Sequence, residues 1–290
     1  MRIMASWLCG LLLCCAGCRA VTLLPAAGEY PTEAAADASA ARARIQTIPV
    51  ELVFVRCEEH DPALGDALWN ETDEQVLDDG LRRRLAANGL RAGIVTGGLP
   101  ADLATRLSPD RPTAADIPAA DGLSTGRLLR LLPGRRSEVV AAASIGELVL
   151  LESLDGQVRG GTYHEAGGSF SLRVQPAADG RVQVELVPEI RHGPMERSWV
   201  GEDGMFRLEA GQRRHRREDL MLRVELAAGS VLVVGGAGDE AATLGDALLR
   251  DRKGDRATRR LLLIRPLGRS VDPMFCAAVA PADDAVLEVR

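Results

Sequence analysis

The residue types that most often carry catalysis or bind metals are few in this chain and widely spaced. The four histidines, His60, His164, His192 and His215, show no spacing typical of a metal site. The chain has no G-x-S-x-G, no H-E-x-x-H and no Walker loop, and the glycine-rich residues 235–239 lack the lysine of a phosphate loop. His164-Glu165 could join a metal site, but we interpret it as a surface pair. The sequence therefore predicts a protein that is not an enzyme and needs no cofactor or metal.

The one basic cluster is residues 213–217, RRHRR, which Glu218 and Asp219 follow. Two interpretations fit this cluster: contact with anionic lipid headgroups or an anionic polymer, or a solvated hairpin turn whose charges the two acids balance. We favour the solvated turn. The acids of residues 73–79 are expected at a solvated helix start, because carboxylates are stabilised at the positive end of the helix dipole.

Residues 1–18 have the features of a secretory leader. Arg2 supplies the positive charge, an apolar run extends through Leu13, and small residues follow. The run is too short to cross a bilayer core of ~30 Å. We therefore expect an exported protein with a signal peptide at 1–18 and an alanine-rich flexible tether at 19–48.

Ala16-Gly17-Cys18, at the end of this leader, resembles the lipobox of bacterial lipoproteins, in which the cysteine becomes the lipidated first residue. Cys15 stands where that family usually has leucine. The resemblance implies lipidation at Cys18 and an anchored place in the periplasm at the outer membrane. An ordinary cleaved leader without an anchor is the alternative.

Only Cys57 and Cys276 lie beyond the leader. In an oxidising compartment they could form a disulfide that ties the tail to the first strand, and so long a loop would add about 4 kcal/mol in the entropy model. Two buried free thiols are the other interpretation. Neither cysteine belongs to a C-x-x-C pair, so the sequence indicates no zinc or redox motif.

The composition excludes some classes of partner. The net charge of the 290-residue chain is −6, which does not favour nucleic acid, because nucleic-acid binding needs a basic face. Aromatic residues make up only 3%, so stacking surfaces for bases or sugars are scarce.

Residues 49–99 are predicted to form a small β-α-β unit. Residues 50–55 and 90–95 have the apolar runs of buried strands. Between them, Thr72 and Gln75 resemble a capping box ahead of a helix that ends at residues 88–89. This helix is expected to present Val76, Leu77, Leu81 and Leu85 on one face.

Residues 100–137 are expected to form a linker, because proline, aspartate and glycine punctuate them. Beyond the linker, alternation of apolar and polar residues predicts a mainly antiparallel β domain at 138–268, with one sheet from about 169 to 266. Residues 269–290 are expected to form a C-terminal tail, and the fold class is α+β. The strands are expected at 139–143, 147–152, 156–163, 169–175, 181–190, 196–199, 205–208, 220–226, 230–234 and 260–265, with a short helix at 243–250.

Three pieces of this domain resemble, in order and spacing, the C-terminal β-domain of secretins, the ring-forming outer-membrane channels of type II and III secretion and type IV pili. The pieces are residues 160–190, 222–236 and 244–266. Leu249 stands where the family often has phenylalanine, and Arg260 stands where it often has an acid. Secretins also carry several modules ahead of this domain, whereas this chain has one β-α-β unit.

The resemblance implies a non-enzymatic structural or assembly protein of the cell envelope. Such a protein would associate with copies of itself through sheet edges, or take part in a secretion or pilus assembly. The alternative is a monomeric envelope lipoprotein that binds a protein partner or a wall polymer.

Overall fold

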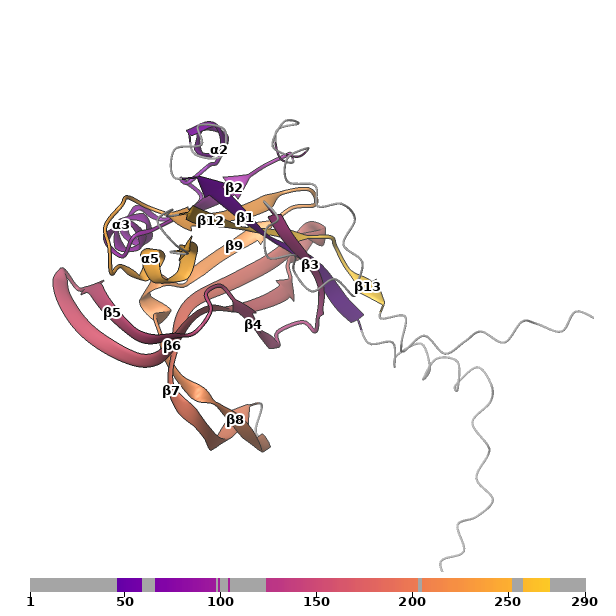
Figure 1. The fold of residues 1–290 in the computed structure, drawn as a ribbon. Coiled ribbons are helices and arrows are strands. Elements are labelled where there is room, and N and C mark those ends of the chain that lie inside the picture. The colour runs from indigo at the N-terminus through magenta and orange to yellow at the C-terminus, as the bar shows by residue number, and fades with distance from the viewer. Residues whose placement is uncertain are drawn as a thin grey trace, which may run out of the picture. The chain divides into compact units, whose positions relative to one another are not determined.

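The computed structural model describes residues 46–58, 66–97, 99, 104, 124–202, 205–251 and 258–271 (Figure 1). Strands dominate these residues and every pairing is antiparallel, so the predicted sheet-dominated fold is confirmed. The predicted leader, Cys18, His60 and Cys276 lie outside the described residues, as do most of the tether and of the tail.

The described elements follow one another along the chain as a long run of strands with three short α-helices. The strands are β1 (Gln46–Glu58), β2 (Leu90–Val95), β3 (Ser124–Leu131), β4 (Arg136–Val140), β5 (Ile145–Leu154), β6 (Gln157–Pro176), β7 (Val182–Glu202), β8 (Met205–Arg216), β9 (Leu222–Leu226), β10 (Val231–Gly236), β11 (Arg250–Asp251), β12 (Thr258–Pro266) and β13 (Ser270–Val271). The helices are α2 (Asp66–Asn70), α3 (Asp79–Ala87) and α5 (Leu244–Leu249), with 3-10 turns η1 (Ala178–Gly180) and η2 (Glu218–Leu220).

The first sheet has seven strands in the order β13-β1-β12-β10-β2, with β3 paired to β1 and β11 paired to β12. Its strand β1 is buried on both faces. Val50 and Leu52 belong to the large core, whereas Val53 and Val55 join a second cluster that includes Leu68 of α2. Burial on both faces explains why β1 reads as a continuous apolar run rather than an alternating one.

The second sheet has six strands in the order β4-β6-β7-β8, with β5 paired to β6 and β9 paired to β7. Its inward residues alternate as predicted: Phe170, Leu172 and Val174 of β6 are at most 1% exposed. These side chains share one core with Leu232 and Ile264 of the first sheet. The two sheets therefore pack across a common apolar layer.

The predicted β-α-β unit is not confirmed. β1 and β2 belong to one sheet, but β12 and β10 lie between them, and the successive antiparallel pairings run β1 and β2 in opposite directions. The strands that separate them come from the part of the chain expected to form the second domain. The predicted domains 49–99 and 138–268 thus share a sheet and a core.

Two further predictions differ from the structure. The stretch expected to be a linker, 100–137, contains β3, which pairs with β1 along eight residues. Residues 169–266 contribute to two sheets rather than one, because the turn at Gly229 leads from β9 in the six-stranded sheet to β10 in the seven-stranded sheet. The two strands that flank this turn therefore form no hairpin.

Helix α3 begins later than predicted. Its N-cap is Asp78, whose carboxylate accepts a hydrogen bond from the backbone N–H of Leu81, while the Thr72 hydroxyl donates to the carbonyl of Leu68. The predicted capping box at Thr72 is therefore wrong. The predicted end is confirmed, since Asn88 is the C-cap and Gly89 follows with a φ of 73°.

Among the described residues, no helix combines the length and the apolar character needed to cross a membrane.

Candidate functional site

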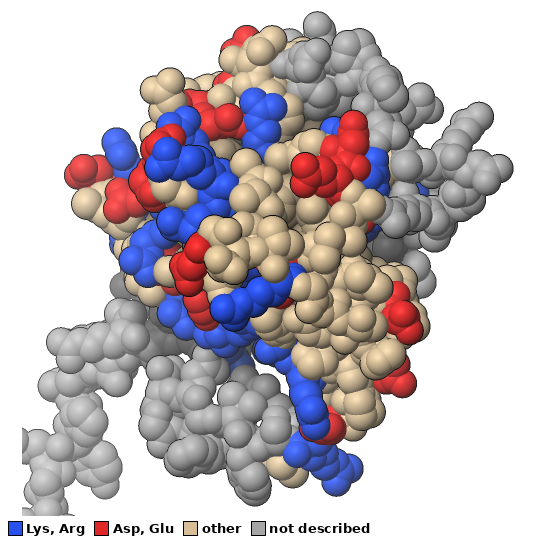
Figure 2. Space-filling model, turned by 90° about the vertical axis from the view of Figure 1, so that its left-hand side faces the viewer, with Lys and Arg blue, Asp and Glu red and all other residues tan. Residues whose placement is uncertain are grey.

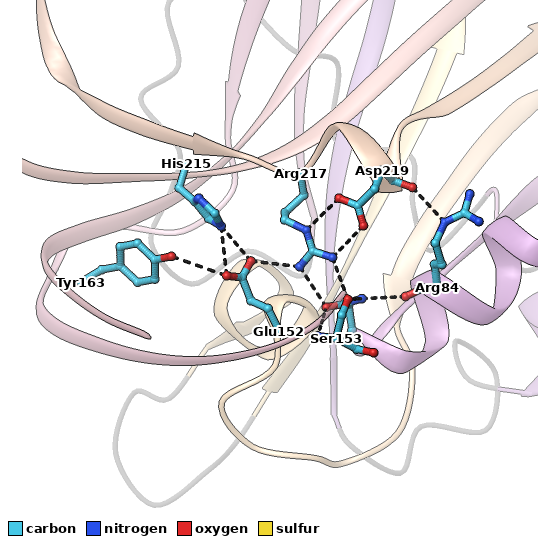
Figure 3. Close-up of polar contacts among 8 residues, drawn as sticks. Arg84, Glu152, Ser153, Tyr163, His215, Arg217 and Asp219 are labelled. Atoms are coloured by element: carbon cyan, nitrogen blue, oxygen red, sulfur yellow. Dashed lines mark hydrogen bonds and ion pairs between the residues drawn. The ribbon is translucent and has the colours of Figure 1, made fainter. Parts of the chain in front are cut away.

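The Arg217 side chain lies at the centre of a buried polar network (Figure 3) and is only 5% exposed. All five of its N–H donors have an acceptor. Nε and Nη2 donate to the Asp219 carboxylate, both at 2.8 Å, and Nη2 also donates to the Ser153 carbonyl at 2.9 Å. Nη1 donates to Glu152 Oε1 at 3.0 Å and to Asn88 Oδ1 at 3.1 Å.

Glu152 is the second hub of this network. Its side chain is 12% exposed and lies 2.9 Å from the Nε2 atom of His215, and the Tyr163 hydroxyl approaches its Oε2 atom at 3.5 Å. Burial alone would raise the pKa of Glu152, but hydrogen bonds and positive charge from His215 and Arg217 outweigh it and lower that pKa. The carboxylate is therefore held in its charged form.

The pKa values of three other side chains in and beside the network are also shifted by their neighbours. Burial and the neighbouring Glu152 charge raise the pKa of Tyr163. The hydrogen bond from Arg217 lowers the pKa of Asp219 against the opposing effect of burial. Burial and the positive charges of His215 and Arg213 lower the pKa of His192, whose ring lies 5.0 Å from the ring of Tyr163.

Five elements of the chain supply this network. Glu152 and Ser153 belong to β5, Tyr163 to β6, His215 to β8, and Arg217 directly precedes η2. Asn88, the C-cap of α3, contributes its side-chain amide. Its Oδ1 accepts a hydrogen bond from the Ser153 N–H at 2.9 Å, and its Nδ2 donates one to the Ser153 carbonyl at 3.0 Å. The network thereby fastens the β5–β6 hairpin to α3 and to the end of β8.

The basic cluster at residues 213–217 is divided between two sides of the sheet. His215 and Arg217 point into the network, whereas Arg214 and Arg216 bond to Glu138 and Glu189. This division follows from the two-residue period of a strand. Because Arg217 is buried and fully paired, the interpretation of the cluster as a solvated turn is wrong for this residue.

The contacts of this network are made within the protein and fasten the β5–β6 hairpin in place. The donors of Arg217 are all used within the protein, and no group of three or more metal-ligating side chains is found in the part of the chain that the structure describes. Its effect is to position a hairpin, so the surface that this hairpin presents is the candidate functional surface.

The outer face of the β5–β6 hairpin is apolar and exposed. Val149, Leu151 and Val158 are 51%, 44% and 70% exposed, and cross-strand pairing places them on one face, opposite to Glu152. Ile145 of β5 is a further exposed apolar residue, so four of the ten large exposed apolar side chains among the described residues lie on this hairpin. We call Val149, Leu151 and Val158 the hairpin stripe.

Figure 2 shows the face of the protein that lies to the left in Figure 1, where α3 and the β5–β6 hairpin are found. Arginines and acids interleave over one part of this face, and a wide area without charges occupies another.

The same hairpin has an open backbone edge. Residues 157–166 of β6 pair with β5, whereas the later residues of β6 pair with both β4 and β7. Within the described residues, no strand covers the second edge of 157–166. The β7–β8 hairpin extends away from the sheets (Figure 1) and pairs with none of these residues. From this hairpin, the Gln212 side chain donates a hydrogen bond to the Glu165 carbonyl at 2.8 Å.

The structure brings together only some of the residues that the sequence analysis singled out. His192 and His215 flank the Tyr163 ring, whereas the His164 ring lies 3.9 Å from Glu147 at an exposed position. Cys57 lies in β1 opposite Arg259, and its possible partner Cys276 is outside the described residues, so the disulfide stays a prediction.

The sequence analysis missed Glu152 as a site residue. A signal was present, because Glu152 continues the inward series of Leu148 and Leu150, where a carboxylate must have a partner.

A comparison with family models, with curated proteins and with solved structures finds no match to this chain.

Proposed function

We propose that the protein is a non-enzymatic structural or assembly protein of the cell envelope, which associates with a second copy of itself through the β5–β6 hairpin. The observation that carries this proposal is one hairpin with both an exposed apolar stripe and an uncovered strand edge. The resemblance to secretins, the secretory leader and the expected lipid anchor at Cys18 support the envelope location.

A second copy is the occupant that this edge favours. An uncovered strand edge presents a row of backbone donors and acceptors, and the same edge of a second copy, turned by a two-fold rotation, presents the complementary row. Such pairing across residues 157–166 would continue the six-stranded sheet from one copy to the next. It would also bring the two hairpin stripes side by side and remove apolar area from water.

The buried network supports this proposal by fixing the hairpin before contact. The Glu152 side chain holds β5 from its inner face, the Ser153 backbone is bonded to Asn88, and Leu151 and its neighbours project from the outer face. A preorganised surface binds more tightly, because less conformational entropy is lost on association.

The mass of the detergent-extracted full chain at micromolar concentration tests self-association. We expect the wild type to have a multiple of the monomer mass and the double variant Val149→Asp/Val158→Asp to be monomeric. Val76→Asp is the matched control, because Val76 is 44% exposed and belongs to neither β5 nor β6. A wild type that is monomeric, or a loss of association in Val76→Asp as well, would contradict the proposal.

The alternative function is a monomeric envelope lipoprotein that holds a protein partner or wall polymer. A cavity of about 320 Å³ between β1, β3 and β4 favours it, with Leu52, Phe54 and Val139 among its apolar lining residues and Arg127 beside them. A monomeric wild type in the mass measurement would favour this alternative.

A further inference from the structure

A second pocket, of about 190 Å³, lies on the outer face of the six-stranded sheet and is rich in arginine. Four strands each contribute one guanidinium to it: Arg136 from β4, Arg173 from β6, Arg216 from β8 and Arg223 from β9. The pocket is also lined by Ser171, Glu185, Val187, Glu218 and Met221.

Strand pairing explains how these arginines meet. Arg136 lies opposite Arg173, Arg173 lies opposite Glu185, and Glu185 lies opposite Arg223. These residues therefore form one row across four strands on a single face of the sheet. Arg216 reaches the pocket from a neighbouring row, where it lies opposite Glu189.

Three of the four arginines are held in place by glutamates. Glu185 contacts both Arg223, at 2.9 Å, and Arg173, at 3.8 Å. The Arg216 guanidinium contacts Glu189, which is only 1% exposed, and also contacts Glu218, at 2.6 and 2.9 Å. These ion pairs fix the directions of the guanidinium groups and leave further N–H donors unused.

Arg136 differs from the other three. In the described part of the chain, its side chain forms no hydrogen bond and no ion pair, and its paired residue across the strands is another arginine. Arg136 is exposed to solvent, and partial burial together with the charges of Arg216 and Arg173 lowers its pKa against the opposite effect of Glu189 and Glu218. Arg173 also carries a buried Nε atom without a hydrogen-bond partner.

Like charges directly opposite each other destabilise a sheet, and the nearby carboxylates of Glu185, Glu189 and Glu218 offset the charges of Arg136 and Arg173 only in part. The protein as a whole has a net charge of −6, so a general affinity for polyanions is not expected. The excess of arginine in this pocket is local and therefore favours one anion site. Guanidinium groups that converge from several strands suit a tetrahedral oxyanion, because each can donate a pair of hydrogen bonds to it.

We propose that this pocket binds a phosphate group, with Arg136 and Arg173 as donors to its oxygens and Arg216 and Arg223 completing the cationic wall. The inference is independent of self-association, since β5 and residues 157–166 contribute nothing to the pocket. The phosphate can belong to a small soluble molecule or to a lipid headgroup, and the experiment separates these two sources.

The test uses the full chain in detergent at low ionic strength. Calorimetry with pyrophosphate probes a soluble phosphate, and co-sedimentation with phosphatidylglycerol vesicles, against phosphatidylcholine vesicles, probes a lipid phosphate. We expect one of the two ligands to bind the wild type and to bind Arg136→Gln at least about tenfold more weakly, as expected for the loss of a charge-assisted hydrogen bond. The matched control is Arg213→Gln, which removes a 67% exposed arginine of the same strand as Arg216, paired to Glu196 outside the pocket.

The thermal stability of Arg136→Gln is the second measurement. Arg136 forms no ion pair with a described residue and lies opposite another arginine, so we expect the unfolding temperature of this variant to equal or exceed that of the wild type. Three results would overturn the proposal: neither ligand binds, Arg136→Gln binds as the wild type does, or Arg213→Gln loses as much affinity. A marked loss of stability in Arg136→Gln would also overturn it, because Arg136 would then have a structural partner.

Discussion

The guanidinium of Arg217 and the carboxylate of Glu152 form an ion pair of 3.0 Å between Nη1 and Oε1, with the two side chains only 5% and 12% exposed. The pair joins the chain after β8 to the C-terminal part of β5. It is the contact through which the protein body holds the hairpin that carries the exposed stripe.

Replacement of Arg217 by methionine is expected to destabilise the protein by about 3 kcal/mol or more, because Glu152 and Asp219 would keep their charges without the buried partner. The free energy of unfolding from urea titration measures this effect. Arg213→Gln is the control and should change stability by less than about 0.5 kcal/mol, since it removes a surface ion pair. Equal effects of the two variants would show that the Arg217 network does not stabilise the fold.

Stability should fall in acid. The folded-state pKa values of Glu152 and Asp219 are lowered, so the stabilisation from these groups is complete above their ordinary values of 4.5 and 3.8 and is lost as the pH falls through the lower folded-state values. Urea titrations between neutral pH and strongly acidic pH should show this decline. In Glu152→Gln the slope below pH 4.5 should be shallower, and an unchanged slope would contradict the assignment.

The elements that the sequence predicts best are those whose side-chain pattern depends on local neighbours. The strand predicted at 90–95 is β2, and the helix predicted at 243–250 is α5 with Thr243 as its N-cap. Each shows its own signal, an apolar run or a capping residue, and needs no distant contact to be recognised.

The length of β6 could not be read in the same way. The sequence analysis expected separate strands at 156–163 and 169–175, with residues 164–168, which end in two glycines, between them. In the structure β6 continues through these residues. A side chain at position 168 would come within 2.7 Å of a methyl group of Leu248, so this glycine serves tertiary packing rather than a turn.

Sheet membership and the buried network depend on contacts that are distant in sequence. β1 pairs with β12, more than two hundred residues away, and this pairing separates β1 from β2. Arg217 contacts Asn88 across 129 positions, and no local pattern around either residue indicates the other. The secretin-like function of the β domain stays a prediction.

The close approach of Gly245 to the loop after α3 gives a further test of the fold. A Cβ atom at residue 245 would lie 1.7 Å from the carbonyl oxygen of Gly89. This oxygen belongs to the backbone, so it cannot move aside without disturbing the chain around it. Gly245→Ala is therefore expected to cost about 2 kcal/mol or more of stability in urea unfolding. Gly146→Ala, where no atom lies within 4 Å, should have little effect, and equal losses would contradict this packing.

Lipidation at Cys18 predicts incorporation of a labelled fatty acid into the protein expressed from its full reading frame. The variant Cys18→Ser should lose this label and leave the membrane fraction, because its only expected anchor is removed. Equal labelling of the wild type and the variant would exclude the anchor. Cys57→Ser is the control and should be labelled as the wild type is.

Amide hydrogen exchange of residues 157–166 tests the central claim most directly, because it observes the proposed edge itself. About half of these amides face away from β5 in an antiparallel ladder and pair with no strand among the described residues of one copy. We predict that they exchange slowly in the wild type and rapidly in Val149→Asp/Val158→Asp at the same concentration. Rapid exchange of these amides in both proteins would contradict pairing of this strand between copies.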